Sequence, residues 1–179
     1  MKSGEINSLF KNLSRTIKNP KTDLKYKNKF TLLVSVVLSA QCTDVNVNNV
    51  TKSLYKKYNK PEHFVKLGRK RIETLIKKIN FFRNKAKSVY LLSKLLIKQH
   101  NSKVPKSFEK LIELPGVGRK TASVVLNEGF GLPTIAVDTH VFRVSNRTGL
   151  AVGKNPDEVQ QNLYKLVPKK YLKKAGHTL

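Results

Sequence analysis

Hydrophobic residues recur at helical spacing along most of the chain. Three clear runs cover residues 54–58, 72–79 and 89–96, where apolar positions lie three or four residues apart. Seven prolines fall between such runs, where helices start or stop. No segment alternates convincingly between apolar and polar positions, and residues 134–137 are too short to be a confident strand. The pattern predicts an all-α protein of nine or ten short helices.

One segment is apolar on nearly every side. Residues 32–40 contain only small polar interruptions, which predicts a central, buried helix. The longest stretch without charge, residues 30–43, is shorter than the ~20 residues that a membrane helix needs. The first ten residues lack the apolar run of a signal peptide. We therefore expect a soluble, cytoplasmic protein.

The charge is strongly positive. The chain has 36 Lys and Arg against 11 Asp and Glu, a net charge of +25. An AT-rich genome would favour Lys over Arg but would not reduce Asp to four residues, so binding to a polyanion is favoured: DNA, RNA or an anionic membrane. We expect most basic residues between 56 and 87 to form a solvated face, and some to reach phosphate: Lys56, Lys57, Lys60, Lys66, Arg69, Lys70, Arg71, Lys77, Lys78, Arg83, Lys85 and Lys87.

The sharpest local motif is LPGVGRKTA at residues 114–122, between two apolar segments. A Gly-x-Gly turn between two helices leaves backbone N–H groups at the start of the second helix, and glycines let a phosphate approach them. This helix-hairpin-helix holds the DNA backbone without reading sequence. The alternative is a tight turn in which glycine only supplies a positive φ. The predicted DNA contacts are Gly116, Val117, Gly118, Arg119 and Thr121.

Lys120 follows this turn, in the first turn of the second helix. The helix dipole disfavours a cation there, and a lysine has to be neutral to act as a nucleophile. A lysine that binds phosphate is the alternative.

A second motif, TIAVDTHVFRV, spans residues 134–144. Asp138 is expected to cap the helix that follows. A carboxylate held by backbone N–H groups stays ionised, so it could also stabilise a developing sugar cation or take a proton. His140 and Arg143 lie on the next turn as candidate DNA contacts, and a packed, hydrogen-bonded role is the alternative for His140.

The third motif is LSAQCTD at residues 38–44. Gln41 could enter a base stack or cap exposed carbonyls. Asp44 is expected to be the N-cap of a helix that begins at Val45. Cys42 is the only cysteine, so an internal disulfide and a multi-cysteine metal site built by this chain are excluded, and we interpret it as structural.

Together these three motifs resemble endonuclease III, the family of helix-hairpin-helix DNA glycosylases with abasic-site lyase activity. The resemblance runs in order from residue 20 to residue 171. It implies a two-lobed fold: a six-helix domain at residues 22–132, with the hairpin at about 108–128, and a second helical domain from residues 1–21 and 133–179. By position, Lys120 matches the lysine that attacks the sugar and Asp138 matches the carboxylate beside it, in a cleft between the lobes.

The resemblance implies base excision repair of oxidised pyrimidines in duplex DNA. The damaged nucleotide would be flipped out, Lys120 would displace the base and form a Schiff base, and β-elimination would nick the strand 3′ to the lesion. Gln41 matches the residue that fills the vacated stack. Asn80 and Phe81 match a second wedge, where the family usually has a glycine and an aliphatic residue. The implied partner is double-stranded DNA with damaged pyrimidines or abasic sites, bound by a monomer. A nucleoid-associated location in a bacterial-type cytoplasm, with no membrane partner, is implied as well.

The resemblance ends before the family's last elements. The family continues with a further helix and a four-cysteine loop that holds a [4Fe-4S] cluster, and those ligands are absent from this sequence. We expect no cofactor in this chain and interpret the sequence as a truncated form of a longer protein, with a shortened variant as the alternative. The N-terminal helix, expected at residues 5–17, would then lose part of its packing surface.

Three other functions compete with this interpretation. A monofunctional glycosylase of the same fold would lack the lysine, so Lys120 argues against it. A non-catalytic or inactive helix-hairpin-helix DNA-binding module is favoured by the missing C-terminal elements and disfavoured by the retention of both Lys120 and Asp138. A basic RNA-binding protein would leave both residues unexplained, and no aromatic platform for single strands is visible.

Overall fold

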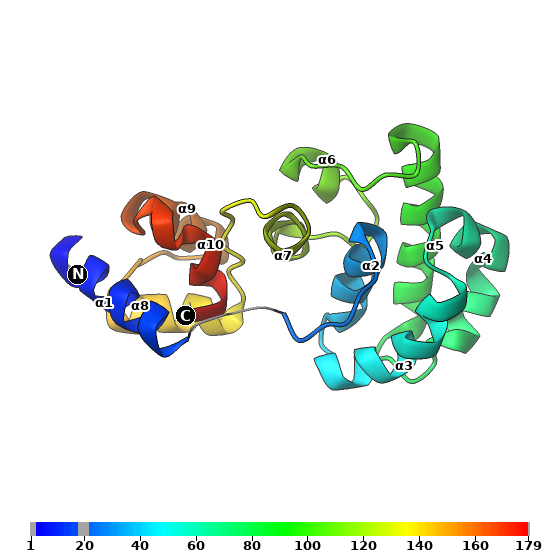
Figure 1. Cartoon of the computed structure of the whole chain (residues 1–179), viewed down its shortest axis with the longest axis horizontal. Helices are drawn as coiled ribbons and strands as arrows, with labels where there is room; N and C mark the ends of the chain where they lie inside the picture. The colour runs from blue at the N-terminus through cyan, green and yellow to red at the C-terminus, as the bar shows by residue number, and fades with distance from the viewer. Residues whose placement is uncertain (1–2, 18–21, 179) are drawn as a thin grey trace. The chain divides into compact units, whose positions relative to one another are not determined.

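The computed structural model describes residues 3–17 and 22–178, and within them it contains ten helices and no strand (Figure 1). The predicted all-α fold is confirmed. The helices are α1 (Ser3–Thr16), α2 (Lys29–Ser39), α3 (Asp44–Lys57), α4 (Pro61–Leu75), α5 (Phe82–His100), α6 (Phe108–Ile112), α7 (Arg119–Phe130), α8 (Thr139–Thr148), α9 (Pro156–Leu166) and α10 (Lys169–Thr178). None of these described helices is long and apolar enough to cross a membrane.

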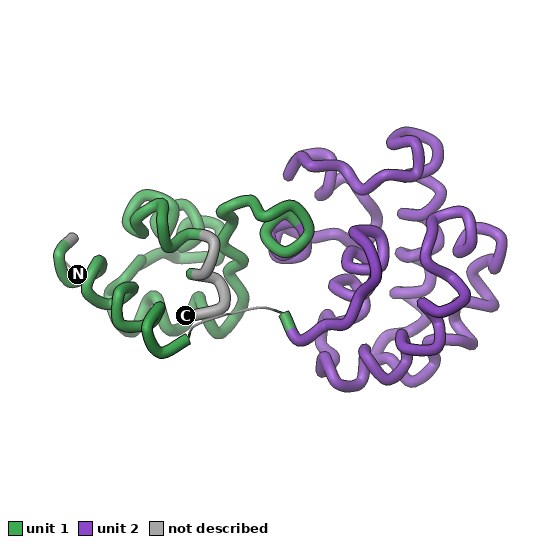
Figure 2. The backbone as a smooth tube through the Cα atoms, viewed as in Figure 1, with its two compact units in different colours: residues 1–22, 126–179 green, residues 23–125 purple. Residues whose placement is uncertain are grey.

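The chain divides into two compact units (Figure 2). Unit 2 consists of Asp23–Val125, and unit 1 joins Met1–Thr22 to Leu126–Leu179. The division falls inside α7, before the boundary after residue 132 that the family resemblance implies. The helix is continuous, so one element belongs to both units.

The buried helix of unit 2 is α2. Its N-terminus is a reciprocal capping box: the Asn28 side chain accepts from the Thr31 backbone N–H at 2.9 Å, and Thr31 Oγ1 accepts from the Asn28 backbone N–H at 2.9 Å. Residues 30–38 are all buried, as predicted for the apolar segment. Phe30 packs edge-on against Phe64 of α4, with ring centroids 5.4 Å apart. The helix ends at Ser39, one residue before the end of the predicted segment.

The C-terminus of α2 is capped by Lys85 of α5. The Lys85 ammonium donates hydrogen bonds to the carbonyl oxygens of Leu38, at 2.8 Å, and Ala40, at 2.6 Å. The last carbonyls of a helix have no partner within the helix, and Lys85 supplies one. The assignment of Lys85 to the solvated basic face is therefore wrong, since the residue is only 8% exposed. Burial lowers the pKa of the Lys85 amine, and the nearby Cys42 opposes this effect.

The start of α3 corrects a second prediction. The N-cap is Thr43, whose hydroxyl accepts from the Asn46 backbone N–H at 3.3 Å. Thr43 has the extended backbone that a cap requires, whereas Asp44 is already the first helical residue. Both residue types can cap a helix, so the sequence alone did not choose between them. The Asp44 carboxylate lies on the first turn of α3 instead.

Unit 1 has its own hydrophobic core, to which α1, α8, α9 and α10 contribute. Ile6 and Phe10 of α1 are buried in it, and the Phe10 ring stacks on Tyr171 at a centroid distance of 5.9 Å. These two residues anchor the N-terminal helix in the core of unit 1. The predicted start of α9 is confirmed, because Asn155 accepts from the Glu158 backbone N–H at 2.9 Å and Pro156 is the first helical residue.

Candidate active site

The hairpin between α6 and α7 lies in unit 2 and has the predicted form. Gly116 has a φ of +79°, a conformation that side-chain-bearing residues rarely adopt. A Cβ at Gly116 would also lie 2.6 Å from Ser88 Cβ. The turn alternative therefore explains this glycine fully: the fold requires it.

Gly118 is different. Its φ lies outside the left-handed region, and a Cβ built on it would have no neighbour within 4 Å. Its carbonyl accepts from the Ala122 backbone N–H at 2.9 Å, which is the first turn of α7. Neither backbone conformation nor packing requires a glycine here. An exposed backbone without a Cβ beside a helix N-terminus is what an approaching phosphate needs.

The side chains of the hairpin divide into buried and exposed ones. Val117 is 6% exposed and its backbone N–H donates to the Leu114 carbonyl at 3.0 Å, so its side chain packs inside the hairpin while its contact with DNA stays a prediction. Arg119 is exposed, with its guanidinium carbon 5.0 Å from the centre of the Phe108 ring. Thr121 is half-buried. The hairpin presents Gly118 and Arg119 to solvent and uses Val117 for packing.

Lys120 is the second residue of α7, and it is exposed. The fold of unit 2 also brings the Asp44 carboxylate near enough to Lys120 for the two charges to interact. Burial and the nearby Asp23 raise the pKa of Asp44, and Lys120 lowers it in part. Sequence analysis missed this carboxylate because Asp44 was interpreted as a cap. No local signal could have found it, since 76 residues separate the two positions.

Asp138 caps α8 in unit 1. Its Oδ1 accepts from the Val141 backbone N–H at 2.9 Å, which confirms the predicted N-cap. His140 and Arg143 are exposed on the first turns of the same helix. Lys120 belongs to unit 2 and Asp138 to unit 1, and residues 131–137 lead from the end of α7 to this cap.

Sequence comparison gives the family. Residues 34–169 match the profile of the HhH-GPD superfamily of base excision DNA repair proteins. Endonuclease III of Rickettsia conorii is 51% identical over 179 residues, which are 100% of this chain and 85% of that protein. Endonuclease III of Escherichia coli K12 is 47% identical over 161 residues, which are 90% of this chain and 76% of that protein. The chain belongs to the endonuclease III family.

Solved structures of endonuclease III have a fold similar to that of this chain. A trapped covalent intermediate of an endonuclease III with DNA has a TM-score of 0.94 and 40% identity, and the match covers 99% of this chain and 84% of that one. A non-covalent endonuclease III–DNA complex has a TM-score of 0.93 at the same identity. A thermostable thymine-DNA glycosylase, 20% identical with a TM-score of 0.85, shares the fold.

The two loops predicted to enter the base stack, around Gln41 and Phe81, are joined in unit 2. Gln41 and Phe81 both have positive φ angles, of 53° and 56°, and Phe81 is 63% exposed. The Asn80 side chain donates to the Gln41 carbonyl at 2.9 Å, and the Asn46 side chain donates to the Lys78 carbonyl at 3.0 Å. Strained backbone persists only where the surroundings hold it. The first bond joins the two loops directly, and the second fixes the residues before Asn80 to the first turn of α3, connections that the sequence did not reveal.

Cys42 lies in the first of these loops. It is half-buried, and its sulfur accepts a hydrogen bond from the Asn46 side chain at 3.2 Å. Across the described residues, no group of three or more His, Cys, Asp or Glu side chains could hold a metal ion.

Proposed function

We propose that this protein is a base excision repair enzyme with two activities, a DNA glycosylase that removes oxidised pyrimidines from duplex DNA and a lyase that nicks the strand 3′ to the lesion. The observation that carries the proposal is the similarity to a trapped covalent endonuclease III–DNA intermediate, at a TM-score of 0.94 and 40% identity. A covalent intermediate needs a nucleophile, and Lys120 stands exposed at the start of α7 in a helix-hairpin-helix.

Lys120 would carry the covalent chemistry. In its neutral form the Nζ lone pair attacks C1′ of the flipped nucleotide, and the base leaves with the electrons of the C1′–N bond. Ring opening gives a Schiff base between Nζ and C1′. Loss of a proton from C2′ then expels the 3′-phosphate, which breaks the strand, and water releases the lysine. Lys120 is unchanged at the end of the cycle.

Asp138 would assist the first step. A carboxylate oriented by the Val141 backbone N–H can stabilise positive charge at C1′ or accept the proton of the attacking amine. Asp44 is a second carboxylate in the field of Lys120, within unit 2.

DNA binding would rest on the hairpin and the two joined loops. Phosphate would approach the backbone at Gly118 and the N-terminus of α7, while Gln41, Asn80 and Phe81 enter the stack beside the flipped nucleotide. A net charge of +25 favours phosphate contacts, so affinity should fall steeply between low and moderate salt.

Borohydride trapping tests the proposal. The wild-type chain, incubated with duplex DNA containing one abasic site and sodium borohydride, should form a covalent adduct. Lys120→Ala should bind the same DNA without forming it. Lys94→Ala, which removes an exposed lysine of α5, is the matched control and should trap normally.

The alternative is a DNA-binding module without catalysis. A wild-type chain that is folded and binds abasic DNA but gives no adduct would support this alternative and contradict the lyase. An adduct that persists in Lys120→Ala would identify another nucleophile. Duplex DNA with an oxidised pyrimidine, in place of the abasic site, tests the glycosylase step separately.

A further inference from the structure

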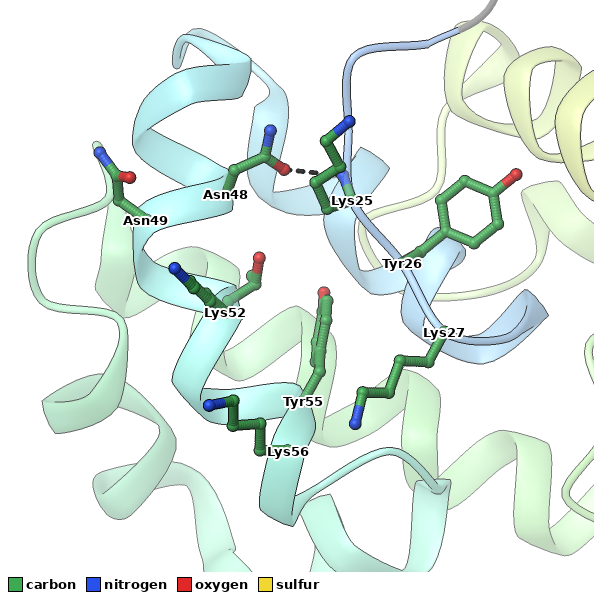
Figure 3. A pocket seen from close by; sticks show the side chains of 9 residues that line it. Lys25, Tyr26, Lys27, Asn48, Asn49, Lys52, Tyr55 and Lys56 are labelled. Atoms are coloured by element: carbon green, nitrogen blue, oxygen red, sulfur yellow. Dashed lines mark hydrogen bonds between the residues drawn. The ribbon is translucent and has the colours of Figure 1, made fainter.

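Unit 2 contains a second feature that the proposed chemistry does not use. A cavity of about 470 Å³ lies between α3 and the segment that precedes α2 (Figure 3). Four of its nine lining residues are lysines and none is acidic; the lining residues are Lys25, Tyr26, Lys27, Asn48, Asn49, Thr51, Lys52, Tyr55 and Lys56. We refer to these nine residues as the basic pocket.

The walls of the basic pocket are held in place at both ends. Asn48 of α3 accepts from the Lys25 backbone N–H at 2.7 Å and donates to the Asp23 carbonyl at 2.9 Å. Further along the same segment, the Asn28 side chain donates to the Asn59 carbonyl at 2.9 Å, just after α3 ends. The segment is therefore fixed against α3 and its following residues at two points. The cavity between them is preformed, which reduces the ordering cost of a ligand.

The floor of the pocket is apolar because its polar groups already have partners. Tyr55 is buried, and its hydroxyl bonds to the Thr31 carbonyl at 3.1 Å and to Ser35 Oγ at 2.7 Å. The hydroxyl of buried Thr51 donates to the Val47 carbonyl at 2.9 Å. Tyr55 is only 3% exposed, so what remains for a ligand is the small accessible part of its ring and the aliphatic carbon of the other lining side chains. An apolar group of a ligand would bury surface against this floor.

The rim of the pocket is cationic. Lys25 and Lys27 come from the fixed segment, Lys52 and Lys56 lie one turn apart on α3, and all four are exposed. None of the four forms an ion pair within the described residues. Like charges gathered around a hollow repel one another, and a bound anion relieves that repulsion.

We propose that the basic pocket binds a nucleotide, with its base against the apolar floor and its phosphate among the lysines. The apolar floor distinguishes a nucleotide from a bare phosphate, and the volume lies within the ~300–1,000 Å³ range of small-ligand sites. The ligand is a free nucleotide or one nucleotide of an unpaired strand, since both present the same chemistry.

The pocket is separate from the loop that carries Gln41. The segment that forms one wall ends at Asn28, the N-cap of α2, whereas Gln41 follows the other end of that helix. The 11 residues of α2 span about 16 Å at a rise of ~1.5 Å per residue. The other wall, α3, begins close to Gln41 in the chain, but the lining of the pocket includes neither Gln41 nor Asn80 nor Phe81. A nucleotide in the basic pocket therefore contacts a different set of residues from one at the joined loops.

Calorimetric titration of the full chain tests the site, with thymidine 5′-monophosphate, thymidine and inorganic phosphate as probes. The monophosphate should bind about tenfold or more tightly than either fragment, because only it uses floor and rim together. Lys52→Gln combined with Lys56→Gln should weaken its binding by about tenfold or more, since two charged partners of the phosphate are lost. Lys94→Gln combined with Lys98→Gln removes an exposed pair with the same spacing from α5 and should leave the affinity unchanged.

Two results would overturn the proposal. One is equal affinity for phosphate and for the monophosphate, and the other is an equal loss of affinity for the monophosphate in the Lys52/Lys56 and Lys94/Lys98 double variants. Competition by a single-stranded oligonucleotide distinguishes the sources, because displacement indicates a nucleotide of a strand and its absence indicates a free nucleotide. Borohydride trapping by the Lys52/Lys56 double variant should equal wild type. The site therefore succeeds or fails independently of the proposed lyase.

Discussion

Lys85 connects the stability of unit 2 to the geometry of the Gln41 loop. The substitution Lys85→Met removes the two hydrogen bonds of the ammonium group while keeping most of the packing of the side-chain stem. Methionine retains most of the apolar stem but cannot donate to the carbonyls of Leu38 and Ala40. Leu38 is fully buried, so its carbonyl would be left without a partner at a cost of about 1–3 kcal/mol. Ala40 is exposed, so water can replace the lysine at its carbonyl. We expect the free energy of unfolding to fall by about 1–2 kcal/mol, because removing a buried charge offsets part of the lost bonding.

Urea unfolding measures this loss, and Lys87→Met is the matched control. Lys87 is exposed two residues along the same helix, so its substitution should change stability by no more than about 0.5 kcal/mol. Lys85→Arg keeps a donor and should retain part of the stability. If Lys85→Met were as stable as Lys87→Met, the cap would contribute nothing and the reasoning would be refuted. Because Ala40 directly precedes Gln41, Lys85→Met should also weaken binding to abasic DNA more than binding to undamaged DNA.

Three further predictions concern the hairpin and the carboxylates. Gly116→Ala should destabilise the protein by about 2–5 kcal/mol, from its positive φ and its approach to Ser88, whereas Gly118→Ala should leave thermal unfolding unchanged and weaken DNA binding in a gel-shift assay. Asp138→Asn keeps an acceptor for the cap, so circular dichroism should be unchanged while single-turnover base excision slows. The pKa of Asp44 is raised in the folded protein, so ionisation of its carboxyl costs stability as pH rises above 3.8. Asp44→Asn should therefore become more stable relative to wild type between pH 4 and pH 7. A difference in free energy of unfolding, measured in urea, that stayed constant over this pH range would contradict the prediction.

Local signals determined much of this protein at the level of sequence. The caps at Asp138 and Asn155 bond to backbone N–H groups three residues ahead, so a short window contains the whole interaction. The burial of α2 follows from its uninterrupted apolar residues, and the hairpin from its glycines and flanking helices. The all-helical fold and the three motifs that place the chain in its family are properties of this kind.

Tertiary structure alone decided the rest, because the deciding contacts join positions far apart in the chain. Lys85 looks like its basic neighbours until the C-terminus of α2 is placed beside it. The link between Asn80 and Gln41 and the approach of Asp44 to Lys120 depend on how helices pack within unit 2. Gly116 and Gly118 are the same residue in the same motif, and only the neighbouring Ser88 shows that the fold requires one of them and not the other. Sequence determines which groups are present, whereas packing determines which of them meet.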